Sequence, residues 1–202
     1  MREVLPGIHH WTAIHPKIRQ PVSSYYYEPV QLLIDPLIPS EGLEWFAAHP
    51  PQQIVLTNRH HYRQSDRFVK EFECVVRCCE PGLHEFEGGP EVEGFAFGEE
   101  LAPGVTAVEV GAICPDDTAL HIAVGNGALA FADALIRPGG GTVDFVPDFL
   151  MGDDPEAVKA GLFDSLEGLL ELPFDSLLFA HGDPLVESGY AALHDFVDNR
   201  QP

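Results

Sequence analysis

Positively charged residues are scarce in this chain. Of its 202 residues only 11 are Lys or Arg, against 32 Asp or Glu, so the formal net charge at pH 7 is −21. Nucleic-acid phosphates and anionic membranes are bound through clustered Lys and Arg, so the composition predicts neither partner. The charge is also uneven, because residues 1–88 carry a net −3 and residues 89–202 a net −18. An imbalance of this kind is typical of a solvated acidic face.

Long apolar runs and a disulfide pattern are missing as well. No apolar stretch approaches the roughly 18 residues of a membrane helix, and the N-terminal sequence MREVLPGIHHW lacks the apolar segment of a signal peptide. The four cysteines fit neither a disulfide framework nor a common zinc spacing: Cys74, Cys78, Cys79 and Cys114. We therefore expect reduced, buried thiols in a cytoplasmic protein.

The chain does contain short apolar strands early and helical periodicity late. Strands are expected over 23–27, 30–34, 54–57, 73–79, 105–110, 120–124, 128–132 and 176–180. Helices are expected over 41–48 with Ser40 as N-cap, over 65–72, after the Asp154-Pro155 N-cap pair, and around Leu193. Gly125-Asn126-Gly127 predicts a hairpin, and the Gly/Glu-rich stretch 87–104 a surface excursion. Without repeats or linkers, this pattern predicts one domain over residues 1–202, of the α/β (α+β) class with helices covering sheets.

Three polar side chains each follow a predicted buried strand. They are His60 after the strand at 54–57, Asp133 after the strand at 128–132, and His181 after the strand at 176–180. In sheets covered by helices, ligands bind outside the carboxyl ends of the strands, so these side chains are expected to share one cleft. Two imidazoles and a carboxylate are a suitable donor set for a divalent metal.

The order of these segments resembles the metallo-β-lactamase superfamily over nearly the whole chain. LLIDP is similar to the family's early strand ending in Asp, and IVLTNRHHYR stands where the H-x-H-x-D-H metal motif is found. ALAFADAL resembles the strand that ends in the bridging metal Asp, and LLFAHGDPL resembles the strand that ends in the last metal His. The resemblance implies a four-layer αββα sandwich with its site at the edge of two facing sheets. No feature specific to β-lactam recognition is present, so antibiotic hydrolysis is not inferred.

The metal motif that the resemblance implies is eroded in this chain. Aligned without a gap, the motif keeps one histidine, which is His60. The other three ligand positions are occupied by Asn58, Tyr62 and Arg63. The family's third histidine falls near 111–114, where this chain has none. With a two-residue gap after Thr57, His60 and His61 instead replace the motif's Asp–His pair. Both alignments stay open, and either brings His60 or His61 to the cleft.

Two functions of different classes follow. The first is a divergent hydrolase holding at most one divalent metal (Zn, Fe or Mn) at His60, Asp133 and His181, with His61 as a further candidate ligand. It would cleave an ester, thioester, amide or phosphoester bond with metal-activated water. Dinuclear zinc hydrolysis is not expected, because too few ligands remain for two metals.

The alternative is a non-catalytic protein of the same fold that holds no metal and binds a small anionic ligand or a protein partner in its cleft. Arg59 and Arg63 are the candidate anion-binding residues, and Asn58 and Tyr62 would line the site. Ion pairing is the more ordinary role for the two arginines. Asp35 is expected to support the site loops through hydrogen bonds. Enzymatic activity, substrate and oligomeric state stay open at this level.

Overall fold

The computed structural model describes residues 1–199 and contains two stacked β-sheets. In the first sheet the spatial order of the strands follows the sequence, with antiparallel pairing up to β4 and parallel pairing beyond it. Its strands are β1 (Arg2–Leu5), β2 (Ile8–Ile14), β3 (Pro21–Tyr27), β4 (Leu32–Ile34), β5 (Gln53–Leu56), β6 (Val75–Cys79) and β7 (Glu93–Phe95).

The second sheet is formed by the later part of the chain. Its strands, in spatial order, are β12 (Ser176–Phe179), β11 (Ala128–Phe131), β10 (Thr118–Ile122), β9 (Val105–Glu109) and β8 (Glu100–Ala102). Only β11 and β12 are parallel, and the other neighbours are antiparallel. The chain crosses from one sheet to the other between β7 and β8.

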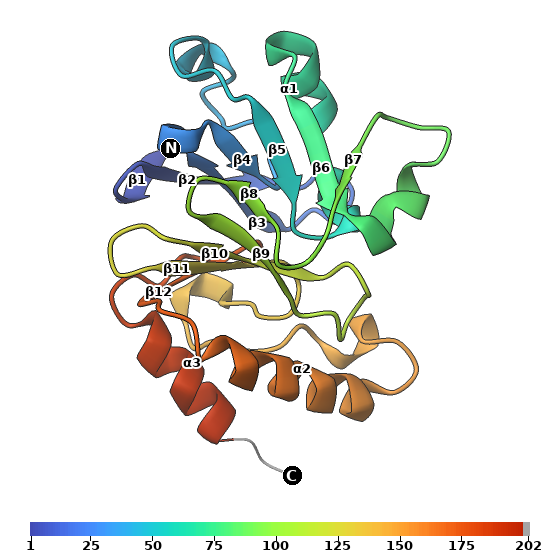
Figure 1. Ribbon diagram of the computed structural model, residues 1–202, viewed down its shortest axis with the longest axis vertical. Coiled ribbons are helices and arrows are strands. Elements are labelled where there is room, and N and C mark those ends of the chain that lie inside the picture. Colours follow the sequence, from blue (N-terminus) through green and yellow to red (C-terminus); the bar gives the residue numbers. More distant parts are fainter. Residues whose placement is uncertain (200–202) are drawn as a thin grey trace.

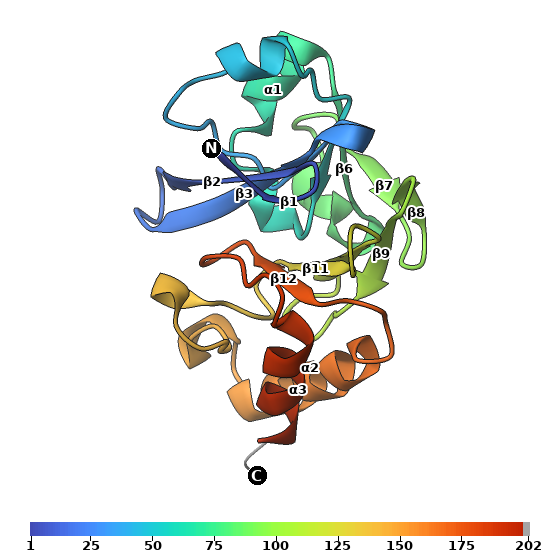
Figure 2. The same ribbon diagram turned by 90° about the vertical axis from the view of Figure 1, so that its left-hand side faces the viewer.

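Helices cover the outer faces of both sheets, so the fold has four layers in the order αββα (Figures 1 and 2). The α-helices are α1 (Ser65–Phe72) on the first sheet, and α2 (Pro155–Leu169) and α3 (Gly189–Asp198) on the second. Short 3-10 turns connect the strands: η1 (Glu28–Val30), η2 (Glu44–Ala47), η3 (Arg59–Tyr62), η4 (Glu80–Phe86), η5 (Pro138–Gly140) and η6 (Asp148–Leu150). Within residues 1–199, no helix has both the length and the apolarity needed to cross a bilayer.

The layers follow from the alternation of side chains along each strand. In β4, Leu32 and Ile34 enter the apolar core between the sheets, whereas Leu33 points outward into the core under α1. In β11, Ala130 faces the other sheet and Leu129 faces α2 and α3. Both faces of these strands are buried, which explains why they are continuously apolar in the sequence.

Most of the predicted elements are confirmed. Helix α1 has the predicted bounds, and Asp154 caps α2 by accepting the N–H of Ala157 at 3.1 Å. The predicted hairpin joins β10 to β11, with positive φ at Gly125 and Gly127, a conformation that glycine adopts without strain.

Two expectations were wrong. The segment 41–48 forms only the 3-10 turn η2, because Gly42 has a φ of +83° and interrupts helical backbone next to Ser40, whose hydroxyl bonds to Glu41 instead of capping a helix. The stretch 87–104 is more than a surface excursion, since it contains β7 and β8 and carries the chain between the sheets.

The fold brings four strand ends to one edge. Parallel strands β4 and β5 end before Asp35 and Thr57, and parallel strands β11 and β12 end before Asp133 and His181. Direct hydrogen bonds join the two sheets at this edge, from the Thr118 N–H to the Thr57 carbonyl (2.9 Å), from the Ser23 N–H to the Ala180 carbonyl (2.9 Å), and from the Tyr25 hydroxyl to the Phe179 carbonyl (2.9 Å).

Candidate metal centre

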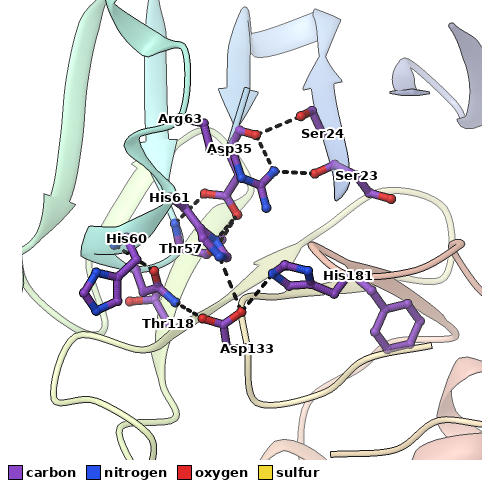
Figure 3. Close-up of polar contacts among 12 residues, drawn as sticks. Ser23, Ser24, Asp35, Thr57, His60, His61, Arg63, Thr118, Asp133 and His181 are labelled. Atoms are coloured by element: carbon purple, nitrogen blue, oxygen red, sulfur yellow. Dashed lines mark hydrogen bonds and ion pairs between the residues drawn. The ribbon is translucent and has the colours of Figure 1, made fainter. Parts of the chain in front are cut away.

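Two histidines and an aspartate meet at this edge. The donor atoms of His61, Asp133 and His181 all lie within 4.8 Å of one another. The Asp133 Oδ1 atom is 3.0 Å from His181 Nε2 and 3.4 Å from His61 Nε2 (Figure 3). His61 comes from η3, directly after β5, whereas Asp133 and His181 each follow the end of a strand of the other sheet. The site therefore spans both sheets.

The orientation of the His61 ring is fixed from behind by Asp35. Its Nδ1 atom is 2.9 Å from Asp35 Oδ2, and because an ionised carboxylate only accepts hydrogen bonds, Nδ1 carries the proton in this pair. The Nε2 atom is thereby left facing Asp133. Carboxylate–histidine pairs of this kind orient metal-binding imidazoles in many proteins.

Asp35 is held by hydrogen bonds, as predicted for a supporting residue. The Thr57 N–H donates to Oδ1 at 2.8 Å and the Thr57 hydroxyl donates to Oδ2 at 2.5 Å. Burial favours the neutral acid, but the adjacent His61 and these hydrogen bonds outweigh it and lower the pKa of Asp35. The residue is an ionised anchor for the ring of His61.

Asp133 is also ionised and anchored. The Asn58 side-chain amide donates to its Oδ2 atom at 2.7 Å. Although burial opposes the charge, His61 and His181 hold the pKa of Asp133 well below its usual range. Burial likewise disfavours the charged form of His61, but Asp35 and Asp133 together raise the pKa of His61 to about 9. In the absence of a metal, the imidazolium of His61 therefore balances charge between two carboxylates.

His60 does not join this group. Its side chain is exposed and its ring points away from Asp133, while its backbone N–H donates to Asn58 Oδ1 at 3.0 Å (Figure 3). Successive side chains of a 3-10 turn point in different directions, so when His61 faces the site His60 faces solvent. The place in the donor group that was predicted for His60 is taken by His61, which was the further candidate ligand.

The arginines and Tyr62 have partners outside the three-residue group. Arg59 pairs with the carboxylate of Asp116 through its side chain and its backbone N–H, so it has the ordinary ion-pairing role. Tyr62 packs its ring against Phe86 in the outer core. Asn58, by contrast, is a site residue through its bond to Asp133.

Arg63 lies closer to the site than Arg59. Its Nη1 atom donates to the backbone carbonyls of Ser23 at 2.6 Å and Asp35 at 2.7 Å (Figure 3). Its Nη2 atom is buried and has no hydrogen-bond partner among residues 1–199. Binding of an anion by Arg63 stays a prediction.

Comparison with solved structures shows which fold this is. A metallo-β-lactamase family protein from Thermus thermophilus superposes with a TM-score of 0.66 and 15% identity, covering 96% of this chain and 79% of the other. A superfamily protein from Sulfolobus tokodaii gives 0.66 and 14%, covering 95% and 85%. TTHA1623, solved in a di-iron-bound form, gives 0.58 and 22%, covering 89% of each chain. No family model and no curated protein matches the sequence.

This chain has the metallo-β-lactamase fold. At the site edge of that fold lie two residues that the sequence did not single out. Asp117, directly before β10, is fully buried. His15, in the loop between β2 and β3, has a pKa lowered by burial and by the nearby charges of Arg63, His61 and His181. The two acidic residues ahead of the strand at 120–124 were the available sequence clue to Asp117, whereas nothing local distinguishes His15.

Proposed function

We propose that this chain is a divergent metallohydrolase that uses one divalent metal, Zn, Fe or Mn, held by His61, Asp133 and His181. The observation that carries the proposal is the convergence of these three donors within 4.8 Å from two separate sheets. A structure with the same fold was solved with two irons bound, which supports metal binding as a use of this edge.

The residues present fit a metal in charge and in orientation. Nδ1 of His61 is occupied by Asp35, so Nε2 is the atom available to a cation. Asp133 is ionised and its second oxygen is held by Asn58, so Oδ1 is directed toward both imidazoles. Imidazole nitrogen and carboxylate oxygen suit zinc, iron and manganese alike, so the donor set does not select among them.

The chemistry expected here is hydrolysis. A divalent metal held by these donors would supply Lewis acidity and a water-derived nucleophile near neutral pH. The protein's part is to hold the donors still. Asp35 and Thr57 fix His61 from one sheet, and Asn58 fixes Asp133 from across the sheet interface. We propose an ester, thioester, amide or phosphoester as substrate, in a cytoplasmic protein without nucleic-acid or membrane partners.

A second candidate function rests on Arg63. Its Nη2 atom is buried without a hydrogen-bond partner within residues 1–199, and a guanidinium nitrogen in that state suits a carboxylate or phosphate oxygen. This observation favours a non-catalytic module that binds a small anion. The two candidates differ in whether the chain carries a metal.

Measuring the metal content of the purified chain distinguishes the two candidate functions. The chain is purified without chelator, supplied with zinc, iron and manganese in turn, and analysed by elemental mass spectrometry beside His181→Ala. His194→Ala, which removes a half-buried histidine of α3 that pairs with Asp198, is the matched control. We expect one metal per chain in the wild type and the control, none in His181→Ala, and hydrolysis in an esterase and phosphodiesterase screen of the loaded protein. Absence of metal under every condition contradicts the hydrolase and directs the search to anions, using Arg63→Gln as the test variant.

A further inference from the structure

Asp117 is the most unusual polar residue of the second sheet. It is fully buried, with an exposed fraction of 0%. Both of its carboxylate oxygens lack a hydrogen-bond partner within the described chain. Buried polar groups in native proteins are almost always satisfied, and a carboxylate without a partner calls for a bound ion or another specific explanation.

The position of Asp117 follows from the strand register. Strands β10 and β11 pair Leu120 with Ala130 and Ile122 with Ala128. Because the two strands are antiparallel, Asp117, directly before β10, and Asp133, two residues after β11, lie at the same end of this strand pair. The next residue, Thr118, donates its N–H to the Thr57 carbonyl and thereby fixes this end of β10 against the site.

The electrostatics agree with that placement. Burial, followed by the charge of Asp133, raises the pKa of Asp117 well above its usual range. The other carboxylates at this edge have cationic partners, since Asp116 pairs with Arg59, and Asp35 and Asp133 pair with His61. Asp117 has none within residues 1–199. The site therefore holds one carboxylate more than its hydrogen bonds and cations satisfy.

We propose that Asp117 is a fourth protein donor to the metal held by His61, Asp133 and His181, which gives a site of two histidines and two aspartates. The inference rests on the proposed function. Asp117 lies outside the group whose donor atoms are all within 4.8 Å of one another, so its side chain turns toward Asp133 when the cation binds. On binding, Asp117 would release to solvent the proton that its raised pKa retains, and the divalent cation would then balance the two opposed carboxylates. The segment that lacks the expected histidine near 111–114 would supply an aspartate in its place.

Two measurements together test this role of Asp117: the metal affinity, and the thermal stability of the metal-free protein. Zinc and manganese are titrated by calorimetry into chelator-treated wild type, Asp117→Asn and the matched control Asp116→Asn. We expect the dissociation constant to rise roughly 10- to 100-fold or more in Asp117→Asn and to stay unchanged in Asp116→Asn. Without metal, Asp117→Asn is expected to melt at a higher temperature than the wild type, because an unsatisfied buried carboxylate has been removed. A residue needed only for packing would not weaken metal binding while raising the melting temperature.

The outcomes separate this inference from the proposed function. If the wild type binds metal and Asp117→Asn binds it with the same affinity, the role of Asp117 is overturned while the metallohydrolase survives. If the wild type binds no metal, both are overturned. Should Asp117→Asn not fold, Asp117→Ala is measured in the same way, and unchanged affinity there overturns the role of Asp117 equally.

Discussion

The two sheets contribute to the site in different ways. From the first sheet come Asp35, Thr57 and His61, which form a closed hydrogen-bond network. From the second come Asp133 and His181 with Asp117, whose carboxylate oxygens have no hydrogen-bond partner within residues 1–199. The side chain of His61 is 7% exposed and that of His181 is 25% exposed. One side is thus rigid and satisfied, and the other is acidic and more open.

The carboxylate that lacks a cation therefore belongs to the second sheet's part of the site, called the second side below, and the first sheet's part is the first side. The division matches the charge along the chain, with a net −3 over residues 1–88 and a net −18 over residues 89–202. A buried carboxylate is tolerated when a cation or several donors face it. The first sheet meets that condition for Asp35 through His61, whereas on the second side Asp116 and Asp133 face cations and Asp117 has no ion-pair or side-chain hydrogen-bond partner within residues 1–199.

Breaking the network on the first side should have the largest effect on stability. Asp35→Asn removes the charge that His61 faces and disturbs the bonds from Thr57, so we expect a loss of about 3–5 kcal/mol in the free energy of unfolding. Urea denaturation of the chelator-treated protein measures it, with the exposed Glu71→Gln as control. A loss below about 1 kcal/mol would show that the hydrogen bonds around Asp35 do not stabilise this side of the site.

The pH dependence of stability tests the charge of His61. Burial lowers the pKa of this group, but Asp35 and Asp133 raise it to about 9, from 6.5 in the unfolded chain. The folded state therefore binds the proton more tightly, and the resulting stabilisation is complete below pH 6.5 and is lost as the pH rises to 9. The shift corresponds to roughly 3 kcal/mol. Denaturation of the chelator-treated protein between about pH 6 and 9.5 should show this slope.

Two variants isolate the contribution of His61 to that slope. His61→Gln should flatten the part of the slope below about pH 8, because no imidazole is left between Asp35 and Asp133. At higher pH the buried cysteines, whose pKa values are raised by burial, keep a slope in both proteins. His84→Gln, which changes a histidine outside the site whose ring bonds to the Pro81 carbonyl, should leave the lower part of the slope intact. An equal slope in the wild type and His61→Gln would rule out the buried imidazolium.

Asn58, which links the first sheet to Asp133 of the second, should contribute less to the stability of the fold than the network around Asp35. Asn58→Ala removes the amide that donates to Asp133 and the oxygen that accepts the His60 N–H. A hydrogen bond to a charged group contributes about 1.5–3 kcal/mol, and we expect a loss of stability in that range by thermal or urea unfolding. Asn126→Ala, in the exposed hairpin turn, is the matched control. If both variants have the same free energy of unfolding, the hydrogen bond from Asn58 to Asp133 does not stabilise the contact between the two sheets.

The smallest effect is expected at His60. Its side chain is exposed and its ring points away from Asp133 (Figure 3), so His60→Ala should change stability by less than about 0.5 kcal/mol and leave metal stoichiometry unaltered. His61→Ala should abolish metal binding in the same elemental analysis. Loss of metal from His60→Ala would restore the ungapped alignment of the motif.

Much of the fold could be predicted from local pattern. Short apolar runs placed β4, β5, β11 and β12, because strands buried on both faces are continuously apolar. The same pattern placed Asp133 and His181, each following a buried strand, at the site. The segment at 41–48 could not be predicted, because the positive φ of Gly42 depends on how the loop packs.

The choice between two adjacent histidines was also beyond the sequence. His60 and His61 are the same residue type in the same turn, and only the position of Asp35, 26 residues away, selects His61. Asp117 was missed for a related reason. An aspartate next to a proline-containing turn is ordinarily exposed, and here the stacked sheets bury it.

Short-range periodicity was enough to predict most strands and helices, the strand ends and the residue types that follow them, because each depends on neighbours in the sequence. The four-layer arrangement was predicted from the resemblance to the metallo-β-lactamase superfamily. Tertiary packing selected which imidazole faces the site, which carboxylates are paired and which one is left without a partner among residues 1–199. Those outcomes depend on contacts between residues far apart in the chain, across two sheets that come together only in the folded protein.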